Sequence, residues 1–95
     1  MSNYRITTID PDYFSETHTV GSSSAQSSAV ITGSGIVRIA VTTQTSIKFG
    51  SNPTATIEDC MIPENNVEFF YFKSGEKIAF IHHGGSGIIN ITSVD

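Results

Sequence analysis

The chain contains no leucine, whereas isoleucine occurs 13 times, valine 6 times and threonine 11 times. These three β-branched types make up about a third of the 95 residues. Their side chains are stiff at χ1 and fit the pleated surface of a sheet, whereas leucine favours helices. The composition therefore predicts an all-β fold and argues against a helical bundle, a coiled coil or a doubly wound α/β domain.

Short apolar or alternating segments, separated by turn residues, predict about 7–9 strands. The clearest alternation lies in residues 36–43, where Val37, Ile39 and Val41 share one face. We expect the other strands of this part of the chain over residues 29–32, 46–49, 55–58, 60–62, 67–73, 77–82 and 88–93. Such a series is typical of a compact antiparallel β-sandwich or a jelly-roll-like barrel.

The last three of these segments are expected to form an antiparallel meander joined by two glycine-containing turns. In the first of them Val67, Phe69 and Tyr71 share one face, and Phe70 and Phe72 share the other. Apolar residues on both faces predict a central strand, or a strand whose outer face is covered by a partner.

A serine-rich segment, residues 21–28, divides the chain in two. Small hydroxyl residues bury little apolar area, so the segment predicts a loop or flexible linker. Residues 1–28 are thus expected to form an extended N-terminal arm with its linker, with short strands at 4–9 and 17–20, and residues 29–95 the β-sandwich domain. Within the arm, the residues that we expect to contact a partner are Tyr4, Arg5, Ile6, Tyr13 and Phe14. The alternative is that the arm aromatics cover the sandwich of their own chain.

The charge balance is acidic, with 5 basic and 9 acidic residues and a net charge of −4. This balance predicts binding neither to nucleic acid nor to an anionic membrane surface. The apolar runs are far shorter than the roughly 20 residues that span a bilayer, and the first ten residues lack the pattern of a secretory signal. The single cysteine, Cys60, excludes an intramolecular disulfide and suits assembly in a reducing cytoplasm.

The residues with reactive side chains do not form a recognisable site. His82 and His83 are adjacent on a predicted strand and should point to opposite faces, which disfavours chelation of one ion. Residues 84–87 are glycine-rich, but a strand follows them rather than the helix of a phosphate-binding loop. Cys60 lies in an apolar segment that predicts a buried structural thiol. We therefore expect no catalytic, cofactor or metal site.

Several segments of the chain match a pattern of strands and turns found in one group of proteins. The segments are residues 28–32, 37–40, 49–55, 61–65, 67–70, 73–79, 85–87 and 89–92. From Ser28 onward, over about two thirds of its length, the chain resembles small β-domain virion proteins of tailed phages, including capsid decoration (cement) proteins. The matching residues are turn and core positions, so they specify a fold better than a role.

The resemblance implies a non-enzymatic structural protein on the outer capsid surface, assembled in the host cytoplasm. Its implied partners are the major capsid protein and further copies of itself, as a homotrimer. The alternative is a structural or carbohydrate-binding β-module of a tail or neck, although the chain has no tryptophan for a sugar-stacking platform. An enzyme is disfavoured because no catalytic set converges in the sequence.

Overall fold

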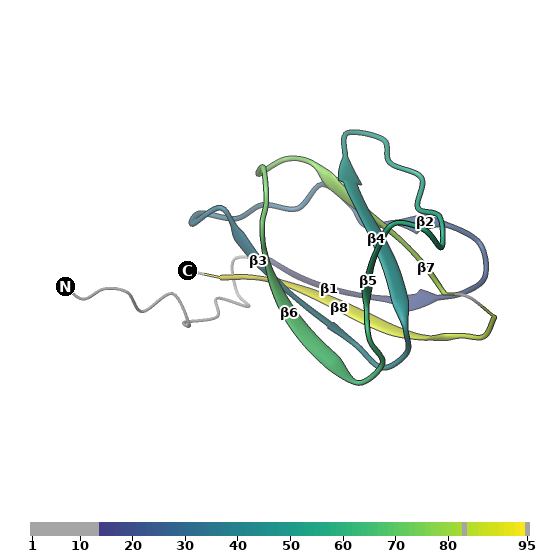
Figure 1. The fold of residues 1–95 in the computed structure, drawn as a ribbon. Coiled ribbons are helices and arrows are strands. Elements are labelled where there is room, and N and C mark those ends of the chain that lie inside the picture. The colour runs from purple at the N-terminus through teal and green to yellow at the C-terminus, as the bar shows by residue number, and fades with distance from the viewer. Residues whose placement is uncertain (1–13, 83, 95) are drawn as a thin grey trace.

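Two antiparallel four-stranded sheets make up the computed structural model, which describes residues 14–82 and 84–94 (Figure 1). This arrangement confirms the predicted all-β sandwich. No helix in the described residues is long and apolar enough to cross a membrane. The strands are β1 (Ser15–Val20), β2 (Ala25–Gln26), β3 (Ile36–Val41), β4 (Thr45–Gly50), β5 (Cys60–Ile62), β6 (Asn66–Tyr71), β7 (Lys77–His82) and β8 (Gly87–Ser93).

The strand order is β1-β8-β3-β6 in the first sheet and β2-β7-β4-β5 in the second. The predicted meander is therefore wrong, because β6, β7 and β8 alternate between the two sheets. Phe70 and Phe72 of the β6 segment pack edge-on against Phe49 of β4, so β6 faces the sheet that contains β7 instead of lying beside it. The turn between β6 and β7 does contain a residue in the left-handed region, Gly75 with φ 98°, but it is a corner between sheets.

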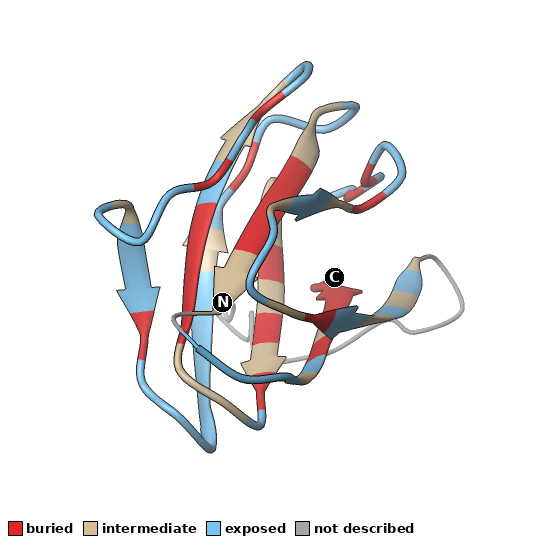
Figure 2. Cartoon of the chain, turned by 90° about the vertical axis from the view of Figure 1, so that its right-hand side faces the viewer, coloured by how far each residue is buried: buried red, intermediate tan, exposed pale blue. Residues whose placement is uncertain are grey.

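The core lies between the sheets and consists of inward-facing β-branched and aromatic side chains. Val37, Ile39 and Val41 of β3 are buried, which confirms the alternation predicted for this strand. Figure 2 shows the buried positions along strands of both sheets and the exposed positions mainly in the connecting loops. The core cluster consists of Val20, Val30, Val37, Ile39, Val41, Ile47, Ile62, Phe72, Ile78, Phe80, Ile89 and Ile91.

Two predicted strands, 29–32 and 55–58, are loops in the structure. Their apolar residues Val30 and Ala55 are nevertheless buried. The Val30 N–H donates to the Glu76 carbonyl at 2.8 Å, and the Ala55 N–H donates to Ser24 Oγ at 2.8 Å. The apolar pattern at these positions therefore reflects loop residues that face the core.

The sheets begin at Ser15, within the segment expected to form an arm. The six residues of β1 pair with β8, which confirms the short strand predicted near residues 17–20. The serine-rich segment contains β2, which pairs with β7. It also contains Ser27, whose N–H donates to the Ile78 carbonyl at 2.9 Å and whose Oγ accepts from the Ile78 N–H at 3.0 Å. Residues 1–13 of the predicted arm, which include its strand at 4–9, lie outside the described residues.

Gly87 occupies a position where the backbone passes close to another segment. A Cβ atom added to it would lie 2.7 Å from Thr43 Cβ and 2.9 Å from Thr42 Oγ1, whereas one added to Gly84 would meet no atom within 4 Å.

We expect Gly87→Ala to lower the free energy of unfolding by about 1–3 kcal/mol because of overpacking. Gly84→Ala is the matched control and should change it by less than about 0.5 kcal/mol. Urea denaturation measures both, and equal effects would contradict the close approach.

Candidate functional site

Of the five residues predicted to contact a partner, one lies within the described residues. Tyr4, Arg5, Ile6 and Tyr13 lie outside the described residues. Phe14 is described and packs, partly buried, against the core of its own chain. Its carbonyl accepts a hydrogen bond from the Ser93 N–H at 3.0 Å. For this one aromatic, the structure therefore agrees with the alternative in which the arm covers its own sandwich.

Among the described strands, β6 has the most large apolar side chains that are exposed. Val67, Phe69 and Tyr71 are 42%, 50% and 87% exposed, and we call these three residues the β6 strip. They alternate with residues that face inward, so all three project from the outer face of the first sheet. Next to the strip, Ile36, Phe69, Phe70 and Tyr71 line an open hollow of about 210 Å³. Among the described strands, β6 is therefore an edge strand with an exposed outer face, and the first alternative for this segment, a central strand, is wrong. The second alternative, a partner that covers the outer face, stays a prediction.

Within residues 14–82 and 84–94, no strand pairs with the outer backbone edge of the β6 strip. β6 is the last strand of its sheet. Phe72, the residue that follows it, donates its N–H to the Gly35 carbonyl at 2.7 Å. In an antiparallel ladder, residues alternate between those that bond to the neighbouring strand and those that bond away from it. Residues 68 and 70 therefore bond to β3, and the N–H and C=O groups of Val67, Phe69 and Tyr71 point outward along the free edge.

The other three sheet edges differ from β6. β2 has two residues and β5 has three, so both offer few backbone groups for pairing. β1 has six residues, but its exposed side chains are Ser15, Thr17 and Thr19. Native proteins commonly protect edges by making them short or polar. Only β6 combines a long free edge with large exposed apolar side chains among the described strands.

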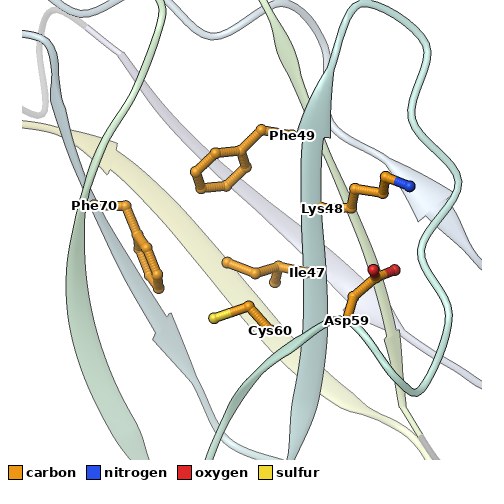
Figure 3. A pocket seen from close by; sticks show the side chains of 6 residues that line it. All are labelled: Ile47, Lys48, Phe49, Asp59, Cys60 and Phe70. Atoms are coloured by element: carbon orange, nitrogen blue, oxygen red, sulfur yellow. The ribbon is translucent and has the colours of Figure 1, made fainter.

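A second open pocket, of about 280 Å³, lies at the rim of the sandwich between β4, β5 and β6. Figure 3 shows the side chains of Ile47, Phe49, Cys60 and Phe70 on one side of β4 in this pocket, with Lys48 on the other side. Cys60 is exposed, so its predicted burial is wrong. The cause is that β5 is a short edge strand, and no further strand of the described chain covers its thiol.

The histidines make local contacts. His18 Nε2 lies 2.6 Å from Glu16 Oε1 on β1, and His82 Nδ1 accepts from the Gly84 N–H at 2.9 Å. His83 lies outside the described residues. Among residues 14–82 and 84–94, no three histidine, cysteine or acidic side chains gather as a metal site would require.

Glu16 connects β1 to the serine-rich segment. Its carboxylate accepts hydrogen bonds from the Ser28 N–H at 3.0 Å and from the Ser28 hydroxyl, in addition to the His18 contact. Partial burial by itself would raise the pKa of Glu16, but the hydrogen bonds from Ser28 and His18 outweigh it and lower the pKa. Glu16 therefore holds the serine-rich segment in place best when it is ionised.

The comparisons with known proteins give no match: no family model matches the chain, and neither does any curated protein or solved structure. The candidate site therefore stands on its geometry. Sequence alternation identified the members of the β6 strip and their common face. It could not show that β6 lies at a sheet edge, because that depends on the pairing of β3 with β6 across about 30 residues of sequence.

The exposure of Cys60 gives a direct chemical test. We expect the thiol of the native protein to react with a chromogenic disulfide reagent about as fast as it does in denaturant, because the side chain is accessible. The measurement is the rate of reagent consumption with and without urea. A reaction that requires unfolding would show that the rim of the sandwich is closed in solution.

The lowered pKa of Glu16 predicts a pH-dependent stability. A carboxyl whose pKa is lower when folded stabilises the protein above its ordinary pKa of 4.5, and this contribution disappears as the pH falls through the folded pKa. Glu16→Gln should therefore cost about 1 kcal/mol at neutral pH. The difference from the unsubstituted protein should shrink below pH 4.5. Urea titrations across this range measure it. Glu58→Gln, in an exposed turn, is the control for loss of one carboxylate and should change the free energy of unfolding at neutral pH by less than about 0.5 kcal/mol.

Proposed function

We propose that this protein is a non-enzymatic structural protein of a phage virion, a capsid decoration protein that binds the outer shell as a homo-oligomer and stabilises it. The proposal rests on the resemblance of residues 28–92 to small virion β-domains. The observation that supports it best is the β6 strip, three large exposed apolar side chains on a free sheet edge. Surfaces of this kind are characteristic of proteins that associate.

Decoration requires only a surface that is complementary to the shell and to neighbouring copies. Apolar side chains leaving water upon binding supply the free energy, at about 25 cal/mol per Å² of apolar area. The net charge of −4 favours solubility of the protein and repels nucleic acid. Within this proposal, Tyr4, Arg5, Ile6 and Tyr13 are further candidates for contact with the major capsid protein.

A tail or neck module that binds carbohydrate is the second candidate. The observation that favours it is the pair of exposed aromatic side chains Phe69 and Tyr71 on one face of β6. Aromatic rings present flat apolar faces of the kind that stack on a sugar ring. Reproducible binding to defined glycans, lost in Tyr71→Ala, would favour this function over decoration.

The test of decoration uses the purified protein and mature capsids of the phage that encodes it, prepared without the protein. We expect the protein to cosediment with the capsids and to raise the temperature at which they release their DNA. Bovine serum albumin at the same concentration serves as the control for nonspecific effects. If the protein neither binds the capsids nor changes the release temperature, the decoration function is wrong.

A further inference from the structure

We propose that two copies of this chain associate through their β6 strands, which pair antiparallel about a two-fold axis at Phe69. The pairing would join the first sheets of both copies into one continuous eight-stranded sheet. This inference deepens the proposed function by naming the contact through which copies associate, and it rests on that function only for its role in the virion. The partner is a second copy because the β6 edge is complementary to itself in backbone, side chains and charge.

The backbone sets which residues can face each other across the axis. Only Val67, Phe69 and Tyr71 direct N–H and C=O groups away from β3, so these residues must bond to the same set in the second copy. Antiparallel pairing of the two β6 strands places the outer face of one sheet on the same side of the joined sheet as the outer face of the other. The strips of the two copies therefore meet side by side.

The side chains select one register among those that the backbone permits. When Phe69 lies opposite Phe69 of the second copy, Val67 lies opposite Tyr71, and every member of the strip faces another member. Shifting the centre to residue 68 would place the two Glu68 carboxylates directly opposite each other, which is unfavourable. Shifting it to residue 70 would leave Val67 facing Lys73. The centre at Phe69 avoids both faults.

The charges at the two ends of β6 agree with this arrangement. Glu64 precedes the strand by two residues and Lys73 follows it by two residues, and both side chains are exposed. Antiparallel pairing brings the Glu64 end of one copy to the Lys73 end of the other, at both ends of the contact. Opposite charges at the rim favour the pairing and fix its direction.

The two-fold geometry has a consequence for the assembly. A strand that pairs with its own copy uses its edge completely, so the contact joins two chains and cannot close a ring of three. The homotrimer that the resemblance implies would need a different surface. A dimer is therefore the unit that we expect to form in solution, whichever contacts it then makes on a shell.

Disulfide trapping tests the register. In a Cys60→Ser background, we expect Phe69→Cys to form a cross-linked dimer under mild oxidation, because the two substituted positions face each other at about 5.5 Å between Cα atoms. Tyr71→Cys is the matched control, since Tyr71 is more exposed but its Cα atom lies about 14 Å from that of its own copy in this register. The double variant Val67→Cys/Tyr71→Cys should cross-link again. Equal cross-linking of the two single variants, or none in Phe69→Cys, would overturn the proposal.

Sedimentation equilibrium tests the association itself. The unsubstituted protein should show a concentration-dependent mass rising from 10.2 kDa towards twice that value. Phe69→Lys places two like charges at the axis and should weaken dimerisation at least about tenfold. Ile57→Lys replaces a similarly exposed apolar residue in the turn before β5, outside the β6 edge, and should leave dimerisation unchanged. A monomer at all concentrations, or a trimer, would contradict the pairing.

Capsid binding separates this inference from the proposed function. If the unsubstituted protein binds capsids but is a monomer or trimer in solution, the decoration function stands and the β6 contact is wrong. If it forms the cross-linked dimer but does not bind capsids, the contact stands and the decoration function is wrong. Circular dichroism of each variant confirms that the sandwich remains folded in both measurements.

Discussion

The packing of isoleucine and valine side chains between the two sheets is the interaction on which the rest of the structure depends. Ile39 of β3 and Ile91 of β8, both fully buried, belong to the same cluster as Phe80 of β7 in the opposite sheet. These central strands are flanked on both sides, whereas a strand at the rim is covered on one side only. The exposed thiol of Cys60 results from this geometry, whereas the side chains of the β6 strip are exposed because they project from the outer face of the first sheet.

The sequence predicts where the strands lie along the chain much better than it predicts which strands pair with each other. Period-two alternation marks β3, and β7 and β8 were located to within one residue, because local propensity and burial agree there. Strand pairing depends on contacts distant in sequence, such as β3 with β6, and no local turn signal distinguishes a hairpin from a corner between sheets. For this one reason the predicted meander and the predicted burial of Cys60 are wrong, and so is the first of the two alternatives for residues 67–73, a central strand.

The candidate site shows the same division. The sequence revealed that Val67, Phe69 and Tyr71 share a face and that a partner could cover it. The structure adds that no strand of the described residues pairs with their outward backbone groups, so this apolar face belongs to a strand that can accept another strand. The serine-rich segment is the opposite case. Its composition suggests a linker, but Ser27 is buried and bonded to Ile78, because a small hydroxyl side chain fits where a loop crosses a core.

The pairing of β1 with β8 has a consequence for the order in which the chain folds during synthesis. Ser15 and Thr92 lie opposite each other although 77 residues separate them in sequence. While the ribosome is adding the intervening residues, β3 and β6 are already able to pair, but β1 has no neighbour in its sheet. The first sheet is completed only when the C-terminal strand has been made, and closing so long a loop is a slow step in folding. Until then β1 has no partner in its own sheet, so β1 and β8 are the last strands of the first sheet to take their places.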